Sequence, residues 1–178
     1  MKTSSLYGVA IAVADALLVL VLFFLGFHSD QAKLPAAQLI GGIGALAIGV
    51  TFTVLGIKAR RAEVPESEPF GYGRALWAGV QVSFVACFLS AIFNYAYFAF
   101  INPGLSDIIV QAQLDKMAAR GMGDAQIERA TQFVRFMWSP GMYAVQTLVG
   151  GFIFAFIISL IIAAFLTRAE STEPPVQA

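Results

Sequence analysis

Residues 6–27 read LYGVAIAVADALLVLVLFFLGF, an apolar run of 22 residues that contains one charged side chain, Asp15. This length matches the roughly 20 helical residues needed to cross the hydrocarbon layer of a membrane. Three further apolar stretches of 22, 27 and 26 residues follow at 36–57, 75–101 and 142–167, and none contains a charge. The sequence therefore predicts four transmembrane spans.

The composition supports a membrane protein, because 58% of residues are apolar and only 12% are charged. A soluble domain carries about 25% charged residues. The apolar runs are continuous instead of alternating at every second residue, which excludes a β-barrel. Helices then remain as the way to satisfy the backbone in lipid. We expect an all-α membrane protein with a four-transmembrane-helix bundle.

One domain is expected over residues 1–168, followed by a polar, disordered tail at 169–178. The first span is too long for the apolar core of a signal peptide, and no small-x-small cleavage pattern follows it. We therefore expect it to remain in the mature protein. Between spans two and three, residues 58–69 form a charged, proline-punctuated linker.

The segment outside the membrane at residues 102–141 is predicted to form two short amphipathic helices. Ser106 and Asp107 can cap the first helix, and Asp124 starts the second after a glycine-containing break. The pair would lie over the outer mouth of the bundle or in the headgroup layer. It would serve as a lid over helix ends or as a docking surface for another subunit.

Orientation follows from basic residues near the ends of the spans. With a cytoplasmic amino terminus, the inside collects Lys2, Lys58, Arg60, Arg61, Arg74 and Arg168. The outside then holds Lys33, Lys116, Arg120, Arg129 and Arg135. Because the last four belong to a separate helical segment, where the rule is weak, we predict that both termini are cytoplasmic.

Charge and ligand counts exclude several functions. Eleven basic and eleven acidic residues leave no net charge. The chain therefore lacks the excess of positive charge that is typical of a nucleic-acid-binding protein. The chain has one cysteine, Cys87, and one histidine, His28, which argues against a disulfide framework or a transition-metal site. We expect no metal and no cofactor.

Asp15 is the sharpest single feature, since it lies close to the middle of the first span. An aspartate at the centre of a span raises the free energy of membrane insertion by about 2.5–3.5 kcal/mol. The fourteen Leu, Ile, Val and Phe residues of this span lower it by up to about 4–8 kcal/mol. The span still inserts, but Asp15 must face the bundle. The polar partners available to it are Gln81, Ser83, Thr51, Thr53 and Ser159.

Three interpretations of Asp15 remain open. The carboxyl could bind a proton or cation on a transport path, or it could fix helix register through a hydrogen bond, for example with Gln81. It could also line a water-filled crevice without a transport role. In the outer half, Asn94 and Gln146 are a further candidate hydrogen-bonded pair. Because His28 sits at a span end, we expect no second titratable group beside Asp15 and no enzymatic activity.

Small residues recur at steps of four along every span, so each row lies on one helix face. Such faces let helix backbones approach closely in lipid. Chance explains the row Ser4-Gly8-Ala12-Ala16 adequately, whereas packing is the better explanation for spans two and four. The predicted packing residues are Gly41, Ala45, Gly49, Gly79, Gly151 and Ala155.

Aromatic residues near the span ends are predicted to be interface anchors and not a ligand cage. The inner set is Tyr7, Phe70, Tyr72 and Trp77, and the outer set is Tyr95, Tyr97, Trp138 and Tyr143.

Several short motifs resemble a known family. They are Phe70-Gly71-Tyr72-Gly73-Arg74-Ala75, Asn94-Tyr95, Ala96-Tyr97, Ile101-Asn102-Pro103, Gln113-Leu114-Asp115-Lys116-Met117 and Gly150-Gly151. Together they resemble the bacterial membrane family called domain of unknown function 4199, most closely from Phe70 to Leu166. The resemblance implies a four-span bacterial inner-membrane protein and carries no established activity.

The leading functional hypothesis from the sequence is a non-enzymatic accessory subunit or scaffold that contacts the lipid bilayer and other membrane subunits, or forms a homo-oligomer. The alternative is a small ion- or proton-coupled transporter or channel that uses Asp15. No inverted repeat, a common feature of transporters, is visible in the spans. Its absence argues against the transporter hypothesis.

Overall fold

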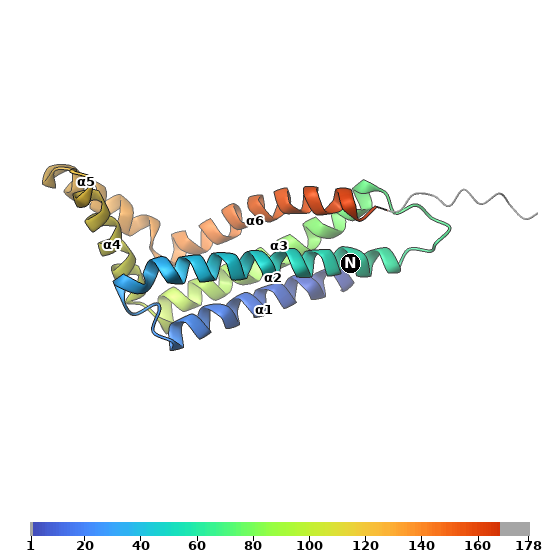
Figure 1. Cartoon of the computed structure of the whole chain (residues 1–178), viewed down its shortest axis with the longest axis horizontal. Coiled ribbons are helices and arrows are strands. Elements are labelled where there is room, and N and C mark those ends of the chain that lie inside the picture. Colours follow the sequence, from blue (N-terminus) through green and yellow to red (C-terminus); the bar gives the residue numbers. More distant parts are fainter. Residues whose placement is uncertain (1, 168–178) are drawn as a thin grey trace, which may run out of the picture.

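The computed structural model describes residues 2–167, and four long helices dominate this part of the chain (Figure 1). They are α1 (Lys2–Phe24), α2 (Leu34–Ala62), α3 (Tyr72–Ala96) and α6 (Pro140–Phe165). Each is long and apolar enough to cross a membrane, with α3 extended by the turn that follows it. The four predicted spans are confirmed as long apolar helices, and they indicate a membrane protein. The predicted tail at 169–178 lies outside the described residues.

Helix α1 ends three residues before the predicted limit because Gly26 reverses the chain. Gly26 has a φ of 75°, a left-handed conformation that glycine adopts without steric cost. The backbone N–H of Phe27 donates to the carbonyl of Leu22, and that of Gly26 donates to Phe23, both at 2.9 Å. These two hydrogen bonds form a Schellman motif, in which backbone carbonyl groups that would lack a partner at the helix end accept hydrogen bonds.

Helix α2 runs past the predicted span end at Ile57 and includes Lys58 to Ala62. The linker therefore begins later than predicted, after Ala62 instead of after Ile57. Arg60 and Arg61 lie in the last turn, where a positive charge interacts favourably with the negative end of the helix dipole. The helix stops just before Pro65, which cannot continue it.

Helix α3 closes with a wider, π-helical turn, η2 (Tyr97–Ile101). The N–H of Asn102 donates to the carbonyl of Tyr97 at 2.7 Å, a step of five residues instead of the usual four. A short 3-10 turn, η1 (Gln31–Lys33), precedes α2 and is capped by the Asp30 side chain. Both turns lie at the same end of the bundle.

Helix α3 forms the centre of the bundle, since it packs along both α1 and α6. A Cβ atom added to Gly8 of α1 would lie 2.7 Å from the Val82 carbonyl oxygen and 2.8 Å from the Val85 Cβ. Ser4 and Ala12, in the same row, are buried. The row on α1 is thus a true packing face, and the chance interpretation was wrong.

On the other side of α3, Gly79 makes a similarly tight contact with α6, because its added Cβ would lie 3.0 Å from Ser159 Cβ. Ser83 Oγ and Ser159 Oγ share a hydrogen bond of 3.2 Å in this interface. The Ser159 hydroxyl also lies 2.8 Å from the Ala155 carbonyl oxygen. Small residues and hydroxyl pairs hold α3 to α6, as membrane helix interfaces require.

Helix α2 packs mainly on α1 and makes few contacts with α6. Its close approaches use Gly44, against Leu18, and Gly56, against Val82. An added Cβ at Gly49 would meet nothing within 4 Å, and Ala45 is exposed. The predicted packing role of Ala45 and Gly49 is therefore wrong within this chain, because the helix turns a different face to α1.

The remaining predicted packing residues have ordinary contacts. An added Cβ at Gly41 would lie 3.7 Å from a Leu22 methyl group, and one at Gly151 would lie 3.6 Å from Cys87 Sγ. Neither distance is short enough to require glycine.

The segment between α3 and α6 contains α4 (Leu105–Ala119) and α5 (Asp124–Met137), which project beyond one end of the bundle (Figure 1). The predicted cap of α4 is wrong, since its N-cap is Gly104 without a side-chain bond. Ser106 Oγ instead donates to the Trp138 carbonyl at 2.9 Å and ties α4 to the start of α6. Asp107 forms an ion pair with Arg135 of α5.

Replacing Gly8 with leucine should lower the free energy of unfolding by about 1–3 kcal/mol, because the side chain would be forced into α3. Gly150→Leu is the matched control on α6, where an added Cβ meets nothing within 4 Å. Detergent-induced unfolding of the purified variants, followed by circular dichroism, measures the difference. Equal unfolding midpoints for both variants would contradict the α1–α3 packing face.

Candidate functional site

Asp15 lies on α1, nine residues before its end, hence about 14 Å from that end at 1.5 Å per residue. Its Oδ1 atom is buried and has no hydrogen-bond partner within residues 2–167. A carboxylate in this position loses its hydration, and only a proton, a cation or a hydrogen-bond donor can compensate for that loss. Asp15 is thus an uncompensated polar group in the middle of an apolar helix.

Two cavities meet at Asp15. The first, here called the His28 cavity, has a volume of about 430 Å³ and extends from Asp15 to His28 and Tyr97. The second, the Thr53 cavity, has a volume of about 450 Å³ and extends toward Thr53 and Ile158. Both are lined by Asp15, Gly42, Ala45, Ser90 and Thr147. Because the two cavities share these lining residues, we refer to them together as the crevice, and Asp15 lines both parts.

The polar neighbours of Asp15 differ from those predicted because α1 and α3 run in parallel with a fixed offset. Gly8 meets Val82 and Val85, so Asp15, seven residues further along, lies level with Ser90. Gln81, one of the partners considered for Asp15, lines a separate pocket with Arg74 and Trp77 and does not pair with Asp15. Thr53 and Ser83 do line the crevice.

The predicted pair of Asn94 and Gln146 is also replaced by other contacts. Asn94 Nδ2 donates to Thr147 Oγ1 at 3.5 Å, and Thr147 Oγ1 donates to the Tyr143 carbonyl at 3.0 Å. Gln146 Nε2 donates to the Met137 carbonyl at 2.6 Å. Adjacent helical residues point about 100° apart, so Thr147 faces Asn94 and Gln146 does not.

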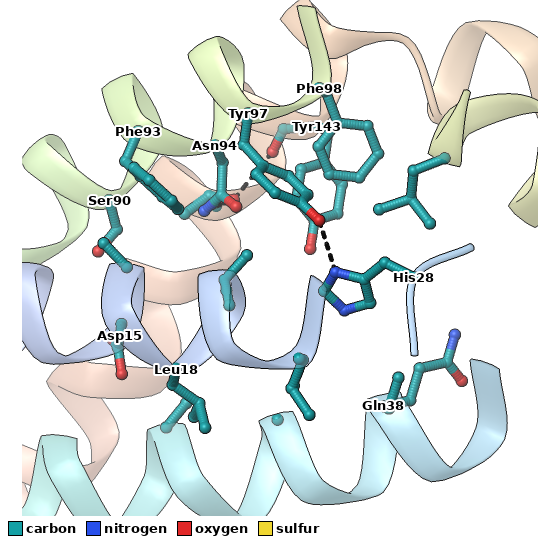
Figure 2. Close-up of a pocket in the computed structure, with 18 of the residues that line it drawn as sticks. Asp15, Leu18, His28, Gln38, Ser90, Phe93, Asn94, Tyr97, Phe98 and Tyr143 are labelled. Carbon is teal, nitrogen blue, oxygen red and sulfur yellow. Dashed lines mark hydrogen bonds between the residues drawn. The ribbon is translucent and has the colours of Figure 1, made fainter. Parts of the chain in front are cut away.

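A polar cluster that the sequence did not reveal closes one end of the crevice. His28 Nδ1 and Tyr97 Oη share a hydrogen bond of 2.6 Å, drawn as a dashed line in Figure 2. Asn102 Nδ2 donates to the His28 carbonyl at 3.3 Å and to Tyr97 Oη at 3.4 Å. The cluster joins the α1–α2 turn to the π-helical turn of α3. The available sequence signal was weak: His28 is the sole histidine and, like Tyr97, lies near an outer span end.

Three predicted outer anchors line the His28 cavity: Tyr97, Trp138 and Tyr143. Tyr97 is only 1% exposed. Phe70 is likewise 1% exposed, within a buried cluster. Trp77 and Tyr95 are exposed and remain compatible with an interface position.

Besides Asp15, the His28 cavity is lined by His28, which lies at the span end where the sequence places it. Figure 2 shows Asp15 and Ser90 toward one end and His28 and Gln38 toward the other. His28 follows the end of α1, and the part of α1 beyond Asp15 is about 14 Å long. The side chains of Asp15 and His28 therefore do not form a hydrogen bond with each other. In the described part of the chain, no three His, Cys, Asp or Glu side chains form a group able to hold a metal ion.

The sequence model of a family of proteins of unknown function, DUF4199, matches residues 6–168. The chain belongs to the DUF4199 family. The match covers all four long helices of this DUF4199 protein and therefore includes Asp15, His28 and the whole crevice. No curated protein and no solved structure matches the chain.

We expect the stability of this DUF4199 protein to depend on pH through His28. Burial lowers the pKa of His28 from its ordinary value of 6.5. The unfolded chain therefore binds the proton more tightly, so stability is complete above about pH 6.5 and falls as the pH drops below it. We expect the thermal unfolding midpoint to fall by a few degrees on acidification, and His28→Asn to flatten this dependence.

Thermal unfolding of the purified protein and of His28→Asn, each at about pH 7.5 and about pH 5.5, provides the measurement. Since His28 is the only histidine, the difference between the two profiles isolates its contribution. Profiles that run parallel would contradict the role assigned to burial of His28.

Proposed function

We propose that this protein is a small cation-coupled transporter in which Asp15 binds the coupled proton or cation. Two observations carry the proposal: the buried Asp15 Oδ1 lacks a hydrogen-bond partner within residues 2–167, and Asp15 lines the crevice. Ionisable groups inside a membrane span are costly, and they usually mark an ion or substrate path. A purely structural aspartate would be expected to bond with Ser90 or Asn94.

The separation of the titratable groups along the crevice favours a transport function over an enzymatic one. Asp15 and His28 stand at separate places along it, whereas a nucleophile and its base must lie within hydrogen-bond reach of each other. We therefore propose a protein without enzymatic activity that moves or exchanges a cation.

We propose that the protein lies in the bacterial cytoplasmic membrane with both termini in the cytoplasm. The end of α2 and the start of α3 lie at the same end of the bundle as the start of α1 (Figure 1). This end carries Lys58, Arg60, Arg61 and Arg74, in agreement with the preference of basic residues for the cytoplasmic side. The α4–α5 segment would then face the outside.

Reconstitution into liposomes tests the proposal. We expect flux of protons, Na⁺ or K⁺ at least about tenfold above that of Asp15→Asn, which removes the ionisable group but keeps the side-chain shape. Asp124→Asn is the matched control, since Asp124 is exposed in the first turn of α5. Flux that is equal in the protein and in Asp15→Asn, for all three cations, would contradict the assignment of Asp15.

A second candidate function, an accessory subunit or scaffold, is supported by α5. Phe133 and Phe136 of this helix are exposed, whereas Val134 between them is buried. Exposed aromatic residues on a projecting helix are typical of surfaces that contact a partner. The partner would be another membrane subunit or a second copy of this chain.

Gentle detergent extraction from the native membrane should then yield a stoichiometric complex or a defined homo-oligomer. The double variant Phe133→Ser, Phe136→Ser should weaken the association by at least about tenfold, because each aromatic anchor contributes on the order of 1–2 kcal/mol. Light scattering coupled to size-exclusion chromatography measures the mass. A strict monomer would count against a scaffold role.

A further inference from the structure

The crevice opens sideways, between α2 and α6. Leu46 of α2 and Phe154 of α6 line the Thr53 cavity and are 44% and 55% exposed. Both lie near the middle of their helices, at the depth of the hydrocarbon layer. On the α2 side, Gly42 and Gly49 have open space where a side chain would be. If the four long helices span the membrane, an opening at this depth would face lipid.

The wall of the crevice combines many apolar side chains with a few neutral polar ones and one acidic group. Asp15 is the one carboxyl among the described lining residues of the two cavities, and these include no lysine or arginine. The walls near Asp15 are built from Ile11, Leu46, Val50, Ala86, Phe154 and Ile158. In such low-dielectric surroundings a single carboxylate attracts one positive charge strongly.

The size of the crevice identifies the kind of cation. Each cavity, at about 430 and 450 Å³, falls within the range of about 300–1,000 Å³ that is typical of pockets for organic ligands. A water molecule occupies only about 30 Å³ in the liquid, so a bare ion would leave most of the space unfilled. Asp15 is the one carboxyl among the described lining residues, whereas divalent ions such as Ca²⁺ usually take several oxygen ligands.

We propose that the substrate of this crevice is a lipophilic organic cation with one positive charge, which enters from the bilayer between α2 and α6. Its charge would lie at Asp15, and its apolar body would contact Phe154, Ile158 and Leu46. The rings of Phe93 and Tyr97, which line the His28 cavity, provide further surface that is favourable to a cation. This inference rests on the cation-binding function proposed for Asp15 and names its substrate class.

Tetraphenylphosphonium is a suitable probe, because it is apolar, carries one positive charge and partitions into membranes. Equilibrium dialysis of the purified full chain in lipid nanodiscs should show saturable binding, with one cation per protein. Asp15→Asn should weaken this binding by about tenfold or more, equivalent to at least about 1.4 kcal/mol. Asp124→Asn should leave it unchanged, and neutral triphenylphosphine oxide should not compete.

A second pair of variants tests the shape of the site without altering its charge. Gly49→Leu places a side chain into the open space on α2 and should reduce binding by about tenfold through steric exclusion. Gly150→Leu adds the same side chain to an exposed position on α6 and should have no effect. Circular dichroism of each variant establishes that it has folded.

Binding that depends on both Asp15 and the open space at Gly49 supports the inference. The absence of saturable binding, or equal binding by folded Asp15→Asn, overturns it. If liposomes show cation flux that depends on Asp15 but no binding of tetraphenylphosphonium, the substrate class is wrong and the proposed function stands. If both measurements are negative, both proposals fail.

Discussion

The close approach of α3 to α1 and to α6 is the constraint on which the rest of the structure depends. Lipid offers helices no hydrophobic drive to associate, so tight backbone packing has to hold them together. Gly8 provides this on one side of α3 and Gly79 on the other. With α3 packed between α1 and α6, α2 rests on α1 and has few contacts with α6. The crevice around Asp15 is the space that this arrangement leaves open.

The spans were predictable because hydropathy and length are properties of a single segment. Residues 36–57 needed no knowledge of their neighbours to be identified as a helix in lipid. The ends of the helices were less predictable, since they depend on local devices such as the Gly26 turn. Asp15 was identified by its depth alone, and its position in the lining of the crevice agrees with the expectation that it faces the bundle.

The contacts between helices could not be predicted, because they depend on the rotation and offset of one helix against another. About two and a half helical turns separate Gln81, one of the partners considered for Asp15, from Ser90, which lies level with it. Small residues illustrate the same limit. Gly8 and Gly49 belong to similar rows in the sequence, yet Gly8 is pressed against α3 and Gly49 borders open space.

The π-helical turn at Tyr97–Ile101 has a consequence for changes in chain length. Such a turn contains one residue more than the α-helical path through the same height. Loss of one residue here would restore a regular helix and rotate everything downstream by about 100°. Asn102 would leave the His28 cluster, and α4 would be re-aimed relative to the bundle. A single codon deletion here would therefore reposition the α4–α5 segment and would also disturb the packing of α6 on α3, because α6 follows in the chain.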